Sequence, residues 1–266
     1  MIRAAVAAFL LSTCGAQATM TPLAMCALRP VFMEDFKTLA IAPHTLTGDA
    51  RWTAHTPWNG DFGDAAFADP GVGGPFGRDA EGLTITARRD AAGHWTSGLI
   101  AAGDASGAGP GVRYGYFEAR MKLPPGPGTW PAFWLGTHVV PGDTAPSVEL
   151  DAIEYYGHDS AGFQSGWHVW PGQKSPGGLH WNKVPADSLT SDFHNYGVRV
   201  APDKTTFYLD RKPVWEIATP PEHTRNLYPL VNLALGSGYP ITDTPNLSVL
   251  RVAYVHVYEL VPGPCR

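Results

Sequence analysis

The stretch that most constrains the fold runs from Val148 to Tyr156 and reads VELDAIEYY. Apolar and acidic side chains alternate through its first half, with the period of two that is typical of a β-strand with one buried face. Glu149 and Asp151 then share one face of the strand, and the apolar residues beside them share the other. The stretch therefore predicts a strand that carries acids on the face turned away from the core.

Glu154 does not follow this alternation. Five positions after Glu149, it would point into the core, where an unpaired carboxylate is costly. A β-bulge near Ala152 and Ile153 adds one residue to the strand and returns Glu154 to the acidic face. Three acids on one face repel one another, so at least one of their pKa values should rise.

The spacing of the two glutamates suits catalysis. With the bulge, Glu149 and Glu154 lie about four strand steps apart, roughly 13 Å between Cα atoms. If each side chain leans inward by ~4 Å, the carboxyl groups approach to ~5–6 Å, the separation used by retaining glycosidases. A raised pKa is also what a general acid needs near neutral pH. The alternative, a solvated acidic face, is less favourable in a chain with only 16% charged residues.

The rest of the chain indicates one all-β domain. No sustained helical periodicity is present, whereas strand patterns and turn clusters recur, and the chain holds 30 Gly and 25 Pro. We predict two packed antiparallel sheets, with a hairpin turn at Asp210-Arg211-Lys212. The clearest strand patterns are Gly82 to Arg88, Tyr116 to Leu123, Thr205 to Leu209, Val214 to Ile217 and Leu250 to Leu260.

Composition and charge disfavour two classes of partner. The net charge is −5, and the 19 Lys and Arg residues are scattered, so the chain lacks the basic patch of a nucleic-acid binder and the polybasic stretch of a membrane-surface binder. Aromatic residues make up 11% of the chain. A neutral polymer is the partner that this composition favours.

Residues 1–18 are predicted to be a cleaved signal peptide. Arg3 supplies the positive charge, Ala4 to Leu11 is an apolar run too short to span a bilayer, and Ala16-Gln17-Ala18 has the small-x-small cleavage pattern. A lipoprotein signal ending at Cys14 is the alternative, which the bulky Thr13 disfavours. We expect a secreted or periplasmic protein in which residues 19–29 form a segment ahead of the domain.

Cleavage after Ala18 leaves two cysteines, Cys26 and Cys265, near the two ends of the mature chain. Lone cysteines in an oxidising compartment often pair, so we predict a disulfide between them. The alternative is two unrelated thiols.

At this point the chain resembles glycoside hydrolase family 16, the laminarinase and lichenase group. Glu149 to Glu154 fits the family's E-x-D-x-x-E motif in its bulged form. Four further stretches match the family in the same order along the chain: Tyr114 to Arg120, Trp130 to Trp134, Asp192 to Gly197, and Leu233 to Gly236. The resemblance runs from about Phe32 to Tyr258, and we therefore predict a family 16 catalytic domain over residues 30–266.

The resemblance implies a β-jelly roll, a concanavalin A-like sandwich with a concave substrate cleft. It also implies roles for the acids: Glu149 as nucleophile, Glu154 as acid/base, and Asp151 as the residue that orients and tunes the nucleophile. The expected activity is that of a secreted retaining endo-β-glycanase acting on β-1,3 or mixed β-1,3/1,4-glucan.

Aromatic residues are expected to bind the sugar rings. Trp130 and Trp134 lie four positions apart on a strand, hence on one face, and a Trp ring can cover the apolar face of a sugar. We predict that both line the cleft; the alternative is that both belong to the core. His168 falls where the family places a His near the scissile sugar, although Trp167 precedes it where a small residue is usual, and a structural role is the alternative.

No cofactor or metal is expected. The family's structural calcium site includes an Asp in the last strand, where this chain has Ala253. No His/Cys/Asp spacing suggests zinc and no Gly-rich phosphate loop follows a strand.

Several alternatives to a β-glucanase stay open. A hydrolase specific for an exopolysaccharide or a galactan, or a transglycosylase, fits the same family resemblance. A carbohydrate-binding protein without catalysis is the alternative from another class, although all three acids are present. We expect a monomer whose partner is a polysaccharide.

Overall fold

The computed structural model describes residues 20–58, 60–171 and 176–261, and these form an almost purely β structure. The helical elements among them are short: a 3₁₀ turn, η1 (Met25–Ala27), and one α-helical turn, α1 (Ser188–Ser191). None of the helices in these ranges has the length and hydropathy that crossing a lipid bilayer requires. The predicted all-β class is confirmed.

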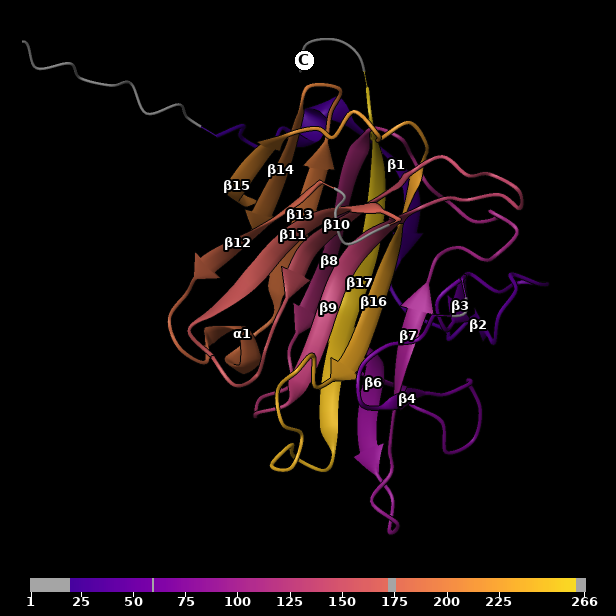
Figure 1. Cartoon of the computed structure of the whole chain (residues 1–266), viewed down its shortest axis with the longest axis vertical. Helices are drawn as coiled ribbons and strands as arrows, with labels where there is room; N and C mark the ends of the chain where they lie inside the picture. The colour runs from indigo at the N-terminus through magenta and orange to yellow at the C-terminus, as the bar shows by residue number, and fades with distance from the viewer. Residues whose placement is uncertain (1–19, 59, 172–175, 262–266) are drawn as a thin grey trace, which may run out of the picture.

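Two layers of strands, antiparallel except for the short β2 and β4, make up the fold, and we call them the outer and the inner sheet (Figure 1). The outer sheet contains, in spatial order, β15 (Lys212–Ala218), β14 (Lys204–Leu209), β13 (His194–Val200), β8 (Gly115–Lys122) and β17 (Ser248–Leu260). The far edge of β17 pairs with β1 (Leu28–Glu34) along one part and with β6 (Gly82–Arg89) along another, and β5 (Phe76–Asp79) pairs with β6.

The inner sheet holds the stretch with which the sequence analysis began. In spatial order it contains β12 (Gly177–Lys183), β11 (Gly162–Trp170), β10 (Ser147–Glu154), β9 (Thr129–Thr137), β16 (Leu227–Leu235), β7 (Trp95–Ala101), β3 (Trp52–Ala54) and β2 (Ile41–Ala42). A parallel two-residue strand, β4 (Ala66–Phe67), and the end of β6 pair with the start of β7 and link the layers at one edge.

The main core lies between the two sheets. Strand alternation decides which side chains enter it: on β8, Phe117, Ala119 and Met121 are fully buried in this core, while Tyr116 and Glu118 point to the other side of the outer sheet. The predicted face of Tyr116 to Leu123 is therefore confirmed. The inner sheet follows the same rule, so its second face is free to form a cleft.

The predicted hairpin is also present. β14 and β15 are joined by Asp210 and Arg211, both in the left-handed region with φ of 49° and 62°, as a two-residue hairpin turn requires. This turn brings Arg211 against β8, where its guanidinium donates to the carboxylate of Glu118.

Two predictions involve residues outside the described ranges. The signal peptide of residues 1–18 lies outside them, and so does Cys265. The described backbone next to Cys26 lies beside the end of β17, because the N–H of Val261 donates to the carbonyl oxygen of Ala27 at 2.9 Å. The disulfide between Cys26 and Cys265 stays a prediction.

Candidate active site

β10 lies near the middle of the inner sheet and contains the predicted bulge. Its register against β11 pairs Asp151 with Gly166 and then shifts, so that Glu154 lies opposite Gln164. Ala152 and Ile153 are both buried in the core at the point of the shift. The extra residue thus returns Glu154 to the face that carries Glu149 and Asp151, for the reason that the sequence indicated.

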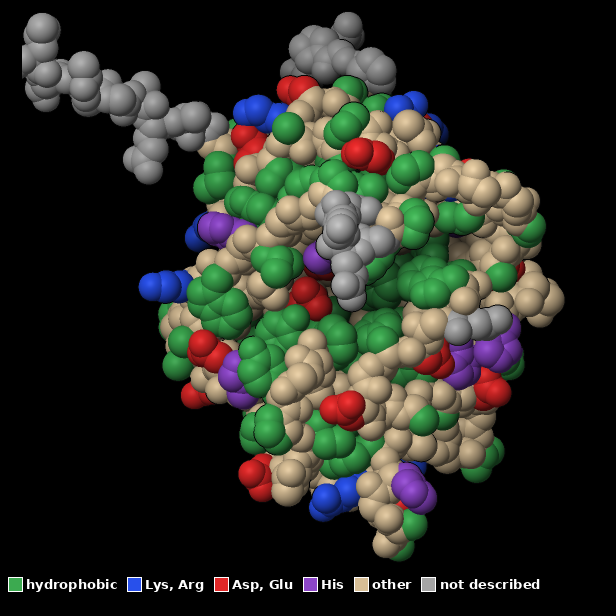
Figure 2. Space-filling view, in the orientation of Figure 1, with side chains coloured by type: hydrophobic (Ala, Val, Ile, Leu, Met, Phe, Trp, Pro, Cys, Tyr) green, Lys and Arg blue, Asp and Glu red, His purple; other side chains and the backbone are tan. Residues whose placement is uncertain are grey.

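The three acids line a cleft of about 860 Å³ on the open face of the inner sheet. Figure 2 shows this face, where apolar side chains gather in a hollow with acidic and histidine side chains beside it. Among the described residues that line the cleft there is no Lys or Arg. The three carboxyl groups therefore lie in a largely apolar cleft whose described lining offers them no cationic side chain.

Indole and phenol groups hold the two glutamates. Trp170 Nε1 donates to Glu149 Oε2 at 3.1 Å, and Trp130 Nε1 donates to Glu154 Oε1 at 3.1 Å. The hydroxyl of Tyr156 donates to the same Glu154 oxygen at 3.2 Å. Each glutamate is therefore fixed in position by neutral donors, which orient a carboxylate without neutralising it.

Burial dominates the electrostatics of the three acids. It raises the pKa of Glu149 to about 7, with a further contribution from the charge of Glu154, against the opposing hydrogen bond from Trp170. Burial and the charges of both glutamates raise the pKa of Asp151 well above its ordinary value. Burial also raises the pKa of Glu154, while Trp130 and Tyr156 lower it. The predicted rise thus affects all three acids, which titrate together as a group.

Asp151 is the most buried of the three, at 4% exposure. Its Oδ2 lies 3.5 Å from Nε2 of His168, too far for a strong hydrogen bond. Burial lowers the pKa of His168 and keeps its imidazole neutral near pH 7. A Cβ on Gly166 would lie 2.7 Å from Oδ2 of Asp151, so glycine at this position leaves the space that the carboxyl group occupies.

His168 lies on the cleft face of β11, directly opposite Glu149. One ring nitrogen of His168 and one oxygen from each of Glu149 and Asp151 lie within 4.8 Å of one another. Trp167, the unexpectedly large neighbour, packs against the core on the opposite side of the strand. Its size therefore does not reduce the space around the acids.

Trp130 and Trp134 both lie on the cleft face of β9, but their exposure differs. Trp130 is half-buried beside Glu154, whereas Trp134 is only 5% exposed and donates from Nε1 to the Asn232 Oδ1 at 2.8 Å. Phe62 and Trp58 pack edge-on against the Trp134 ring at 6.1 and 5.9 Å between centroids. Trp134 thus forms the floor of the cleft, beneath side chains that are more accessible to a ligand.

Sequence reasoning missed several residues of this site. Trp170 and Tyr156 hold the glutamates, and Trp58, 54% exposed, forms an aromatic wall with Phe62. Trp170 lies two positions after His168, and Tyr156 lies two positions after Glu154, so alternation along each strand could have placed both on the cleft face. Trp58 and Phe62 lie on a long connection after β3, where no periodicity indicates direction.

The chain belongs to the family described as glycosyl hydrolases family 16, whose model matches residues 78–244. This range is more than half of the chain and includes β10 with all three acids. The predicted family is therefore confirmed, and the comparisons support the predicted class of glycoside hydrolase.

Curated relatives match at moderate identity. Endo-1,3-1,4-beta-glycanase EglC of Rhizobium meliloti (strain 1021) is 34% identical over 151 residues, 55% of this chain and 30% of the relative. Glucan endo-1,3-beta-glucosidase A1 of Niallia circulans is 30% identical over 168 residues, 56% of this chain and 24% of the relative. The chain thus spans about a third or less of the length of these relatives.

Solved structures share the fold. The laminarinase catalytic domain of Thermotoga maritima MSB8 superposes with a TM-score of 0.67 at 21% identity, over 87% of this chain and 98% of the other. The endo-beta-1,3-glucanase of Pyrococcus furiosus gives 0.67 at 22% identity, over 89% and 96%. These similarities confirm the predicted jelly-roll sandwich.

Proposed function

We propose that this protein is a retaining endo-β-glycanase that hydrolyses β-1,3- or mixed β-1,3/1,4-glucan. The observation that carries the proposal is the group of one buried and two half-buried carboxyl groups with raised pKa values in an open, aromatic cleft. Carboxyl groups kept partly protonated near neutral pH can supply both a nucleophile and a general acid. Relatives named as endo-1,3-1,4-beta-glycanase and glucan endo-1,3-beta-glucosidase support the substrate class.

In the first step, Glu149 attacks the anomeric carbon and forms a covalent glycosyl-enzyme, while Glu154 donates its proton to the leaving glycosidic oxygen. The hydrogen bond from Trp170 fixes the attacking carboxylate. The bulge places Glu149 and Glu154 on the same face of β10, and the spacing of ~5–6 Å expected for their carboxyl groups favours direct attack by Glu149 over a mechanism in which water fits between sugar and base.

In the second step, Glu154 removes a proton from water, which attacks the anomeric carbon and releases Glu149. Asp151 assists throughout: burial and the charges of both glutamates raise the pKa of its carboxyl group, which favours the neutral form and limits the negative charge next to Glu149. If both groups were ionised, their repulsion would raise the energy of the attacking carboxylate. We therefore assign Asp151 a tuning role, as the family resemblance implies.

The cleft suits a neutral sugar chain. Trp130, Trp170 and Trp58 offer partly exposed aromatic rings that can cover sugar faces, and Asn232 and the acids offer polar groups for hydroxyls. The cleft is open rather than a closed cavity in Figure 2, which favours attack within a long chain over removal of terminal units. A charged polysaccharide would find no Lys or Arg among the described lining residues.

The test is product analysis on a panel of neutral β-glucans. We expect β-1,3- or mixed-linkage glucan to be cut into oligosaccharides whose new reducing ends appear first as the β-anomer in proton NMR. First appearance of the α-anomer would contradict the assignment of Glu149 as nucleophile. Binding of glucan without release of reducing ends would instead favour a carbohydrate-binding protein.

We also propose that the enzyme acts outside the cytoplasm, in the extracellular medium or the periplasm. The support is the pattern of residues 1–18, which is typical of a signal peptide. N-terminal sequencing of the mature protein should begin near Thr19. Mature protein that still begins at Met1 would contradict this proposal.

A further inference from the structure

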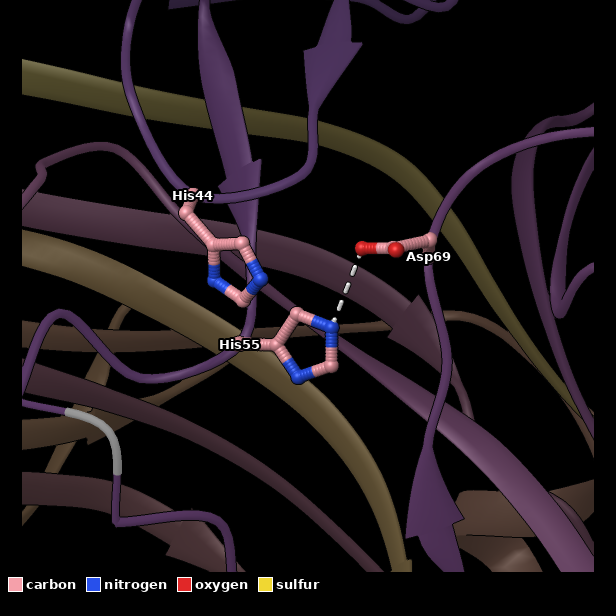
Figure 3. A group of neighbouring side chains, drawn as sticks. All are labelled: His44, His55 and Asp69. Carbon is pink, nitrogen blue, oxygen red and sulfur yellow. Dashed lines mark hydrogen bonds and ion pairs between the residues drawn. The ribbon is translucent and has the colours of Figure 1, made fainter.

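A second cluster of polar side chains lies outside the acids of β10. His44 belongs to the connection after β2, His55 follows β3 directly, and Asp69 follows β4 (Figure 3). One ring nitrogen of each histidine and one carboxylate oxygen of Asp69 lie within 4.8 Å of one another. Three segments thus converge on one point, each contributing one atom that can bind a metal ion.

The environment of His55 is that of a metal ligand. Its Nδ1 lies 2.6 Å from Oδ2 of Asp61, and its Nε2 lies 3.2 Å from Oδ1 of Asp69. The other oxygen of Asp61 accepts the N–H of Thr56 at 3.2 Å and is thereby held in place. Histidines that bind metals usually donate the second ring nitrogen to such a carboxylate, which fixes the tautomer and the ring orientation.

A metal ion would fit between His55 and Asp69 both by charge and by distance. If the Nδ1 proton is donated to Asp61, the lone pair on Nε2 faces a carboxylate oxygen, which repels it. Either a second proton or a metal ion removes this repulsion. Two ligands of a tetrahedral zinc ion at ~2.0–2.1 Å lie about 3.3 Å apart, and the observed separation is 3.2 Å.

His44 completes the set. Its ring stacks on that of His55, with centroids 4.6 Å apart and planes inclined by 22°, so the exposed His44 side chain has to rotate before both rings direct a lone pair at one ion. His44 is exposed and the Asp69 side chain is 58% exposed, whereas the His55 side chain is 14% exposed. The deepest ligand is therefore fixed, and the two outer ligands leave an entry path and room to adjust.

We propose that His44, His55 and Asp69 bind a divalent transition-metal ion, with zinc as the best match to two imidazoles and one carboxylate. Asp61 orients His55 through Nδ1, and water fills the fourth position. The sequence shows no zinc signature because its ligands lie on three separate segments. The site therefore departs from the expectation, drawn from spacing alone, that the chain holds no metal.

A bound ion at this point would fix one wall of the cleft. Thr56 follows His55 and accepts the N–H of Gly60 at 2.8 Å, so the connection closes on itself beside the site. Trp58 and Phe62, which contact the ring of Trp134, belong to the same connection. Joining His55 to His44 and Asp69 ties this connection to two neighbouring segments.

Zinc titration by isothermal calorimetry tests the proposal, using the whole chain without a histidine tag and stripped with EDTA. We expect one zinc ion per chain for the wild type, and an affinity at least about tenfold lower for His44→Gln and for Asp69→Asn. Asp61→Asn, which removes only the orienting carboxylate, should lower the affinity by about tenfold to a hundredfold. His44 has the fewest structural contacts, so its variant should remain folded.

Two matched variants locate the ion. His168→Gln removes the imidazole beside Asp151, the other place where described residues converge, and His256→Gln removes a histidine paired with Asp35. Both should bind zinc with wild-type affinity. Cobalt(II) should give the strong visible absorption of a four-coordinate site, which His44→Gln should lose. No binding to the wild type, equal affinity in His44→Gln, or loss of binding in His168→Gln would each overturn the proposal.

Discussion

Glu118 on the outer sheet and the acids of β10 on the inner sheet are all buried or half-buried carboxyl groups, yet their environments differ. Glu118 is fully buried, and the Arg211 guanidinium donates to both of its oxygens at 2.8 and 2.9 Å. The hydroxyls of Tyr116 and Tyr254 lie 2.6 and 2.9 Å from the same carboxylate. Burial would raise the pKa of Glu118, but these hydrogen bonds and the charge of Arg211 lower it below its ordinary value.

Among the described residues, the acids of β10 have neutral donors and no such cation. Trp170, Trp130 and Tyr156 donate to the glutamates, and His168 beside Asp151 is neutral. Burial therefore prevails and raises all three pKa values. The comparison shows that burial alone does not set the charge of a carboxyl group; the presence of a partner cation decides it. Glu118 stabilises the fold as an anion, whereas the β10 acids stay reactive at a cost in stability.

The largest effect should follow from removing the proposed nucleophile. Glu149→Gln keeps the shape of the side chain but cannot attack the anomeric carbon, so we expect glucan hydrolysis to fall by at least about 10⁴-fold. Initial rates on soluble β-glucan, with circular dichroism as a control for folding, measure this. A variant that retains more than about a tenth of the activity would mean that Glu149 does not form the covalent intermediate.

The next effect should come from the outer sheet. Arg211→Met leaves Glu118 buried without its cation, and we expect the free energy of unfolding to fall by about 3 kcal/mol at pH 7. The loss should shrink toward pH 4, because Glu118 can then take up a proton. Urea denaturation measures it, and the activity of the folded fraction should be unchanged.

The double variant Glu118→Gln with Arg211→Met is the matched control. It removes the charge together with its partner, so it should recover most of the lost stability. A loss below about 1 kcal/mol in Arg211→Met alone would indicate that water reaches Glu118, and the contrast between the two sheets would then weaken.

In the cleft, removing a charge should have the opposite effect on stability at high pH: Arg211→Met destabilises the fold there, whereas Glu149→Gln should stabilise it. Because the folded-state pKa of Glu149 is raised from 4.5 to about 7, its ionisation penalty is absent below the ordinary pKa and complete above about pH 7. Glu149→Gln should therefore be as stable as the wild type at pH 4 and more stable by about 2–3 kcal/mol at pH 8. Urea denaturation at both pH values tests this; a gain of equal size at pH 4 would point to packing rather than charge.

The smallest effect should follow from changing the cleft wall. Trp58 is 54% exposed and packs against Trp134 by its edge, so Trp58→Ala should raise KM for glucan by about tenfold, or about 1.4 kcal/mol, and leave the melting temperature nearly unchanged. Trp134→Ala is the control, because loss of this buried ring should destabilise the fold by about 3–5 kcal/mol. If Trp58→Ala and Trp134→Ala changed stability by similar amounts, the distinction between an exposed cleft wall and a buried cleft floor would be wrong.

The sequence by itself determined the all-β class, the bulged strand and the position of the three acids. Alternation with a period of two is a local property of the chain. An acid that breaks it would point into the core unless a β-bulge returns it to the other face. Glu154 therefore revealed the bulge before any contact was known. The family followed from Glu149 to Glu154 and four further stretches in order, because these matches depend on the sequence alone.

Only the tertiary structure decided what surrounds these acids. The contact of Trp170 with Glu149, the space that Gly166 leaves for Asp151, and the meeting of His44 with His55 and Asp69 all join residues distant in sequence. Trp134 was placed on the correct face, but its cover by Trp58 was not foreseen, because that residue lies on a long connection without periodicity. Strand alternation fixes the face on which a side chain lies, while its partners, and hence its charge, depend on how separate segments pack together.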